Sequence, residues 1–467
     1  MKKFDKGFAL LGYVVVIAIL LIASFMAYTT WSGAESHQTQ YNIAETKAYF
    51  LAKEAIIKRC LIYLRTKKPT ELPMGTIFLG TIIRPDYGFC DNITVRRISS
   101  MSEGDVFQRQ DYYLLSADGN APFHKSNRED GIVTRNVKCK VRMRSYSNYL
   151  YLTDIETTTF NEIIWFWGPG RDTLDGRVHS NDFIGMKGRP TFLGSVTTCQ
   201  NRFIQGEGYN PDFRIPPRFN VTKVEFPEFA QNVRNNASHR FDDNDGTLMT
   251  RIHCNGEAIT VYQYVIGEIF EPNNIVSTTT FRTPSWGAIF VEGQAEIYGI
   301  VAGGCTFGTA GNMWLIDNIK IAETNNDDGM GNENMVQLIG LISERNIIIA
   351  NNWENGRENM AQGQDIIINA SMVALDESFT FQHQNDDWEA YQGPTPDERG
   401  TIYMWGSVAQ KRRGYVHRSN HIGTGYNKMY RYDKRLDQRP PPYFLDVVDE
   451  EGRGLFDIVQ WQYNTEE

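Results

Sequence analysis

The chain has 467 residues, of which 41% are hydrophobic and 22% charged, and this ordinary globular composition provides material for two or three domains. Its 40 Gly, 23 Tyr and 26 Phe favour β structure, because aromatic side chains suit pleated surfaces and glycine suits tight turns. The formal net charge is -9 and no stretch concentrates Lys and Arg, which argues against nucleic acid as a partner.

The N-terminal segment predicts a membrane anchor, whose residues are Lys2, Lys3, Lys6, Val14, Ile19 and Leu21. An uncharged apolar run over residues 8–28 follows the three lysines, and roughly 20 helical residues cross a hydrocarbon core of about 30 Å. Because cations favour the cytoplasmic side, we expect a single-pass inner-membrane protein whose C-terminal domain is periplasmic or at the cell surface. A cleaved signal peptide is the alternative, but the run is longer than a typical signal-peptide core.

The residues that open this run carry a more specific pattern. A basic leader over residues 1–7, with Gly7 followed by Phe8 and an apolar helix over residues 8–30, resembles the start of type IV pilins and type II secretion pseudopilins. The resemblance implies cleavage after Gly7 and methylation of Phe8. Gly12 stands where most major pilins carry Glu, so a minor pilin or a plain signal anchor fits better than a polymer-forming pilin.

Helical periodicity continues beyond the membrane segment. Apolar residues recur at helical spacing with charged residues between them, which predicts a helix over residues 31–68 that ends at Lys67-Lys68-Pro69. A long helix that runs from the membrane into a soluble domain is the architecture of pilins, although any anchored domain can use one.

The next region, residues 69–160, predicts a small membrane-proximal α+β or β domain. Short β-rich runs lie at residues 76–79, 93–95, 111–115 and 137–143, and the last alternates apolar and basic residues as a half-buried antiparallel strand does. Asp118-Gly119 and Pro122 predict loops between these strands.

Longer motifs begin near residue 146. The run over residues 147–154 is followed by D-x-L-x-G-x-V-H-S-N at 172–181 and by G-x-P-x-F-x-G-x-V at 188–196, with Gly- and Tyr-rich segments over 414–444. This pattern resembles a family of exported bacterial proteins of unknown function that join a PilX-like N-terminus to a β-helical body. The resemblance implies an architecture but no activity.

Repeated apolar fragments predict a solenoid over residues 161–450, followed by a tail over 451–467. Gly340-Leu341-Ile342, Ser371-Met372-Val373 and Gly406-Ser407-Val408 lie about 31 and 35 residues apart. Self-similarity at this period is typical of stacked coils. We therefore expect a mainly β protein with a C-terminal parallel β-helix, and a jelly-roll β-sandwich is the alternative.

The clearest candidate for chemistry is the turn motif that contains Asp175, Gly176, His179, Ser180 and Asn181. A hydrolase would pair its Asp, His and Ser, but a nucleophile needs a sharp elbow and a base that arrives from elsewhere in the fold. We therefore interpret the five residues as structural, and we assign no catalytic residue.

The sequence favours no metal site and no cofactor. The oxygen-rich loops at residues 242–246 and 325–329 permit a weak Ca²⁺ site, but neither has the EF-hand spacing. His417 and His421 lie in a Gly-rich segment, so their spacing does not place both on one helix face. The six cysteines form no C-x-x-C pair, and both disulfides and buried free thiols remain open.

These observations predict a non-catalytic cell-envelope protein, either a minor component related to pili or pseudopili or an adhesin or scaffold. Its expected partners are the membrane, pilus or type II secretion components, and extracellular polysaccharide. The alternative is a surface-anchored polysaccharide-active enzyme on a β-helix. Scattered carboxylates and aromatics that fit such an enzyme, none of them informative, are Asp365, Asp376, Glu377, Asp386, Asp387, Trp388, Tyr391, Tyr403 and Trp405.

Overall fold

The structure, a computed structural model, describes residues 5–99, 111–124, 130–159, 161–352, 354–355, 365–382, 398–418 and 424–463. The protein is mainly β, with 45% strand and 19% helix, and one long apolar helix at its N-terminus, which confirms these coarse features of the predicted fold class. The chain forms two compact units: the first comprises Met1–Ser99, Asp111–Arg142 and Phe456–Glu467, and the second comprises Ser100–Gln110 and Met143–Leu455.

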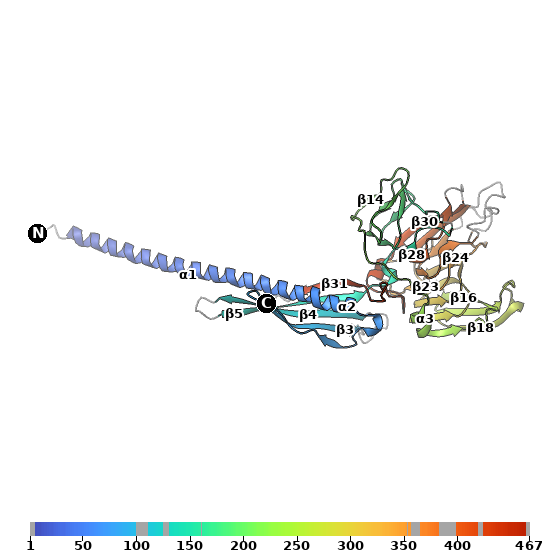
Figure 1. The fold of residues 1–467 in the computed structure, drawn as a ribbon, viewed down its shortest axis with the longest axis horizontal. Helices are drawn as coiled ribbons and strands as arrows, with labels where there is room; N and C mark the ends of the chain where they lie inside the picture. Colours follow the sequence, from blue (N-terminus) through green and yellow to red (C-terminus); the bar gives the residue numbers. More distant parts are fainter. Residues whose placement is uncertain are drawn as a thin grey trace. The chain divides into compact units, whose positions relative to one another are not determined.

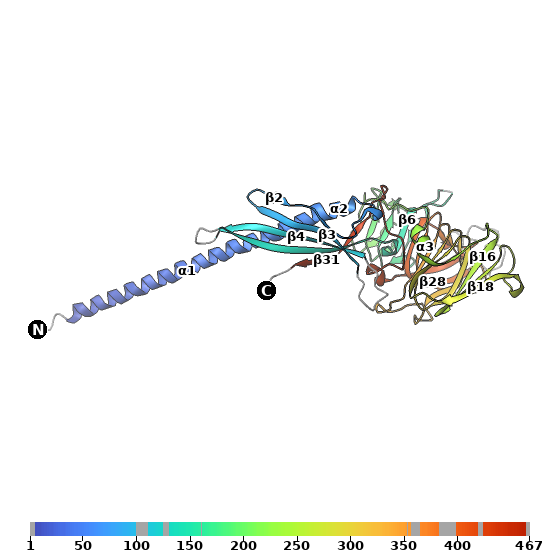
Figure 2. The ribbon, with the colours of Figure 1, turned by 90° about the horizontal axis from the view of Figure 1, so that it is seen from below.

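The first unit begins with a long helix, α1 (Asp5–Ala55), which continues through a π-helical turn, η1 (Ile56–Leu61), into α2 (Ile62–Arg65). Helical structure therefore ends three residues before the predicted boundary at residue 68. Residues 11–36 are exposed along their whole length, and this part of α1 is long and apolar enough to cross a membrane. Figures 1 and 2 show the N-terminal part of α1 extending beyond the strands of its own unit.

The sheet of the first unit has the strand order β1-β3-β4-β5-β31, with β2 paired to β3. The pairs among β1 to β5 are antiparallel, and the four β-rich runs predicted from sequence fall largely or wholly within β1, β3, β4 and β5. Residues assigned to a C-terminal tail form the last strand, β31. The bounds are β1 Thr76–Phe78, β2 Ile82–Arg84, β3 Gly88–Ser99, β4 Asp111–His124, β5 Asp130–Met143 and β31 Phe456–Tyr463.

The loop predicted at Asp118-Gly119 and Pro122 is wrong, because β4 runs through all three residues and pairs with β5 along this whole length. Gly119 is needed for a different reason. A Cβ on Gly119 would lie 1.9 Å from the carbonyl oxygen of Ala48 on α1, far inside van der Waals contact. Glycine here lets the backbone of the helix approach the backbone of the sheet, and the buried neighbours Ala48 and Ala52 keep that approach close.

The described part of the second unit contains one short α-helix, α3 (Gln231–Asn236), and a large sheet that curls and closes on itself, together with two three-stranded sheets, β13-β10-β7 and β14-β11-β8. Most strand pairs are parallel, and the antiparallel pairs include β16–β17, β17–β18 and β29–β30.

The first strands of this unit, up to the short helix, are β6 Tyr151–Ile155, β7 Phe166–Trp167, β8 Thr173–Leu174, β9 Val178–Ser180, β10 Gly185–Lys187, β11 Thr191–Phe192, β12 Val196–Thr198, β13 Ile204–Gln205 and β14 Asp212–Phe213. Those that follow it are β15 Ala237–Phe241, β16 Leu248–Gly256, β17 Ala258–Val265, β18 Ile275–Arg282, β19 Trp286–Val291, β20 Ala295–Val301, β21 Gly304–Thr309, β22 Met313–Ile321, β23 Ile339–Ser343, β24 Ile347–Ile349, β25 Ile366–Ile368, β26 Ser371–Ala374, β27 Phe379–Phe381, β28 Glu398–Arg412, β29 His417–Arg418 and β30 Thr424–Tyr432.

The repeated fragments found in the sequence lie side by side in this sheet. Gly340 pairs with Ser371, as the spacing of 31 residues predicts. Ser371 pairs with Ser407 rather than with Gly406, so the second interval is one residue longer than expected. The strand that carries the last fragment, β28, also pairs with β6 in parallel, with Val408 opposite Tyr151. The first strand of the unit therefore adds to one of its last strands, and we call the β28–β6 pair the seam.

The close approach at Gly119 gives a test of the first unit. Replacing Gly119 with Val forces the helix away from the sheet, and we expect the free energy of unfolding of this unit to fall by about 2 to 3 kcal/mol. Urea unfolding with proteolytic mapping measures the change. Gly75→Val is the control, because a Cβ at Gly75 meets no atom within 4 Å. Equal stabilities of the two variants would contradict the account.

Candidate functional site

The turn motif lies inside the second unit, not at an open surface. His179 on β9 is 2% exposed, its Nδ1 lies 2.8 Å from Thr197 Oγ1 and its Nε2 lies 3.1 Å from Asn181 Oδ1. Burial lowers the pKa of His179 from 6.5 to about 4. The imidazole is therefore neutral at neutral pH and serves as a hydrogen-bonding link between neighbouring strands.

The other motif residues join segments that are distant in sequence. Asn181 donates to Asp154 Oδ1 at 2.7 Å and to the carbonyl of Val224 at 2.7 Å, and accepts from the amide of Val224 at 2.9 Å. The hydroxyl oxygens of Ser180 and Thr153 share a hydrogen bond at 2.9 Å.

The remaining two motif residues contact the C-terminal strand β30. Asp175 accepts a hydrogen bond from the amide of Tyr432 at 2.8 Å. A Cβ on Gly176 would lie 2.8 Å from the ring of Tyr432 and 2.6 Å from Leu150. All five motif residues therefore take part in packing and hydrogen bonding between strands.

The structure brings a cysteine to this motif that the sequence analysis did not connect with it. Cys199 Sγ lies 3.4 Å from Asn181 Oδ1 and 4.0 Å from His179 Nε2. A Cys, His and Asn grouping suggests a thiolate nucleophile, but burial raises the pKa of the Cys199 thiol to about 11. Only the parallel stacking of β9 and β12, about 18 residues apart, juxtaposes these residues, and no local motif in the sequence marks that stacking.

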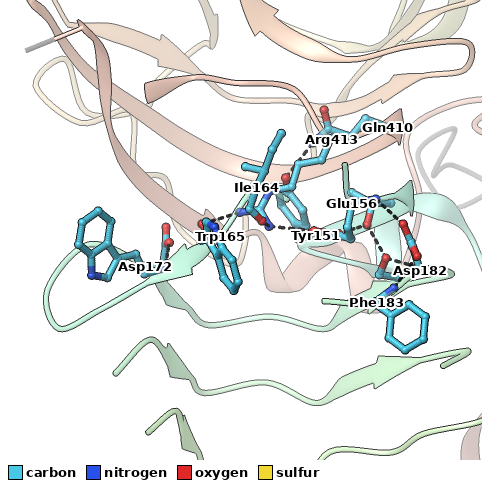
Figure 3. Close-up of polar contacts among 12 residues, drawn as sticks. Tyr151, Glu156, Ile164, Trp165, Asp172, Asp182, Phe183, Gln410 and Arg413 are labelled. Atoms are coloured by element: carbon cyan, nitrogen blue, oxygen red, sulfur yellow. Dashed lines mark hydrogen bonds and ion pairs between the residues drawn. The ribbon is translucent and has the colours of Figure 1, made fainter. Parts of the chain in front are cut away.

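A buried ion pair lies beside the seam. Arg413, directly after β28, donates to Glu156 Oε2 at 2.8 Å and to the carbonyl of Ile164 at 2.9 Å, and both charged side chains are at most 4% exposed. Its guanidinium also lies 3.8 Å from the centre of the Phe166 ring. Figure 3 shows Arg413 extending toward the segment that carries Ile164 and Trp165.

The polar groups around this pair are also satisfied. Glu156 accepts a second hydrogen bond from the Thr153 hydroxyl, and its amide donates to Asp182. Gln410 donates to the phenolic oxygen of Tyr151 at 2.8 Å and accepts from two backbone amides. The network therefore joins residues about 257 positions apart in the sequence.

A cavity of about 70 Å³ lies next to this network. Asp172 at its edge accepts from the amide of Trp167 at 2.7 Å and forms an ion pair with Lys428. The cavity is lined by Tyr151, Ile164, Trp165, Phe166, Arg171, Asp172, Thr173, Leu174, Phe379, Gln410, Arg413, Gly414, Tyr415, Val416, His417, Lys428 and Tyr430.

The carboxylates and aromatic residues that the sequence suggested for a polysaccharide-active enzyme are not among the described residues that line this cavity. Asp376 forms an exposed ion pair with Arg345, and Asp365 accepts a hydrogen bond from the amide of Thr401. Trp405 is buried. Neither Tyr403 nor Glu377 lines the cavity, and Asp386, Asp387, Trp388, Tyr391 and His421 lie outside the described residues.

The oxygen-rich loops use their side chains locally. Asp242 accepts from the amide of Asn244, and Asn325 accepts from the amide of Asp327. Among the described residues, no group of three or more His, Cys, Asp or Glu side chains is arranged to hold a metal ion. All six cysteines are free thiols, so no disulfide is present between them.

The predicted anchor lies on α1. Val14, Ile19 and Leu21 are exposed, and Gly7 and Phe8 lie within the helix, whereas Lys2 and Lys3 lie outside the described residues. Comparison of the chain with protein-family models, curated proteins and solved structures finds no match.

Breaking the buried ion pair tests the seam. Arg413→Met leaves Glu156 charged and unpaired in the interior, so we expect the free energy of unfolding of the second unit to fall by about 3 to 5 kcal/mol. The double variant with Glu156→Gln should lose less, since no uncompensated charge remains. Arg345→Met is the control, because its ion pair is exposed and should contribute at most about 1 kcal/mol. If Arg413→Met matches the control in urea unfolding, the seam does not depend on this pair.

The lowered pKa of His179 predicts a pH dependence. The unfolded chain binds a proton near pH 6.5 and the folded chain only near pH 4, so stability falls as the pH drops through this window. One proton corresponds to a slope of at most about 1.4 kcal/mol per pH unit. We expect the stability difference between the native protein and His179→Gln to be constant above pH 7 and to shrink or reverse toward pH 4.5. A difference that does not change with pH would show that His179 titrates normally.

Proposed function

We propose that the protein is a membrane-anchored, non-catalytic component of the cell envelope, related to minor pilins, that holds its second unit outside the cytoplasm. One observation carries the proposal. Residues 11–28 of α1 expose apolar side chains on every side, and the same helix continues into a segment that is buried against the sheet of the first unit. A helix that is apolar all round is stable where lipid or other helices surround it.

The rest of α1 supports a pilin-like role. Ala44, Ala48 and Ala52 face the sheet and are buried. Ile43 and Phe50 lie seven residues apart on the other side of the helix and are 51% and 53% exposed. An exposed apolar row of this kind suits packing against further helices, and pilus or type II secretion components are the partners that we propose.

The second unit supports the role of an extended scaffold. We propose that its finer architecture is a parallel β-helix, because β19, β21, β23, β26, β28 and β6 follow one another in parallel register. Stacked coils of this kind place exposed residues in rows that suit the binding of an extended partner.

The described cavity favours binding over catalysis. A glycosidase needs two carboxyl groups that flank the scissile bond. Asp172 is paired with Lys428, and the nearby Glu156 is paired with Arg413, so each carboxylate already has a cation. This arrangement supports a binding component rather than the alternative of a polysaccharide-active enzyme.

Mass spectrometry of the mature N-terminus tests the proposal. We expect a chain that begins at N-methylated Phe8, because Gly7-Phe8 resembles a prepilin-peptidase site. Gly7→Asp should retain the leader, whereas Gly12→Ala is the control that should be processed normally, since a Cβ at Gly12 meets no atom within 4 Å. An intact Met1 would contradict the pilin pathway, and an N-terminus beyond residue 28 would indicate a cleaved signal peptide.

A further inference from the structure

The cavity beside the seam has the features of a ligand site, whether or not α1 anchors the protein in a membrane. The cavity is formed by the segment over residues 164–174 together with residues 413–417 and part of β30. Its volume of about 70 Å³ corresponds to roughly two water molecules. The space therefore suits a small polar group, with the remainder of a larger ligand outside it.

The charges around the cavity favour an anion. Four charged side chains line it: Arg171, Asp172, Arg413 and Lys428. Asp172 and Lys428 neutralise each other, and Arg413 is neutralised by Glu156 behind the wall. Arg171 has no carboxylate within ion-pair distance among the residues that the structure describes, so one positive charge is left over.

The side of the wall formed by His417 offers no free donor. Its Nδ1 is sealed from the cavity, and the ring forms a hydrogen bond with the backbone of Tyr426. Burial, with Lys428 and Arg171 nearby, lowers the pKa of His417, so the imidazole adds no charge to the cavity at neutral pH. Arg171 is held in place by Trp167, whose ring centre lies 4.8 Å from the guanidinium carbon.

Aromatic side chains complete the wall. Trp165, Tyr415 and Tyr430 line the cavity together with the charged groups. Faces of aromatic rings pack against the apolar C–H face of a sugar, while a guanidinium binds a carboxylate. We propose that this cavity binds the carboxylate of an acidic saccharide, with Arg171 as its recognition group.

Isothermal titration of the full-length protein in detergent with D-glucuronate, D-glucose and acetate tests the proposal. We expect glucuronate to bind with a Kd below about 10 mM, and both glucose and acetate to bind at least about tenfold more weakly, because one lacks the charge and the other lacks the ring. Arg171→Gln should weaken glucuronate binding about tenfold. Arg189→Gln is the matched control, since Arg189 is also exposed in this unit but does not line the cavity, and it should bind as the native protein does.

Three results would overturn the proposal: no glucuronate binding below about 10 mM, glucose or acetate binding as tightly as glucuronate, or an unchanged Kd in Arg171→Gln. Because Arg171 is exposed, its replacement should leave the fold intact, and an unchanged unfolding midpoint verifies that the loss reflects the site.

Discussion

The parallel pairing of β28 with β6 is the interaction on which the second unit depends. The same backbone segment of β28 pairs with β26 through Met372↔Val408 and with β6 through Val408↔Tyr151. Without the second pairing, β28 and β6 would each present an open edge, and open edges invite association with other chains. Through this pairing, the early segment that contains β6 to β14 joins the sheet formed by the later strands of the unit. Closing so long a loop costs little more entropy than closing a moderate one, since the cost grows only with the logarithm of length.

The polar groups near the seam have their positions because the seam is buried. Glu156 and Arg413 satisfy each other there, and Asn181 satisfies both backbone groups of Val224. Burial explains the chemistry as well: the thiol of Cys199 stays protonated and the imidazole of His179 stays neutral. The pKa values of these groups keep them uncharged at neutral pH. The motif that looks catalytic in the sequence is therefore suited to hydrogen bonding between strands. At the edge of the same region lies a small cavity, where Arg171 has no carboxylate within ion-pair distance among the described residues.

Local patterns predicted those parts of the fold that depend on local physics. The uncharged run at residues 8–28 predicted the apolar helix, and the alternation at residues 137–143 predicted an antiparallel strand. The fragments beginning at Gly340 and Ser371 predicted a pairing that the structure has, because parallel stacking places similar apolar side chains in register. Contacts between residues that are distant in the sequence could not be predicted from these local patterns. The sequence around Gly119 predicts a turn, and only the structure shows that the backbone of Ala48 requires glycine there. Likewise, no residue near Arg413 in the sequence indicates its ion pair with Glu156 or the cavity.

We propose that one helix, α1, both anchors the protein in the membrane and packs on the first sheet. Protease accessibility in spheroplasts shows on which side of the membrane the second unit lies. Subsequent extraction of the membranes with alkaline carbonate shows whether the protein is anchored in them. The account predicts that the full-length protein stays in the membrane pellet, and that external protease removes the region after the apolar helix while a cytoplasmic marker remains intact. Full-length protein in the carbonate supernatant, or a second unit protected from protease in intact spheroplasts, would contradict it.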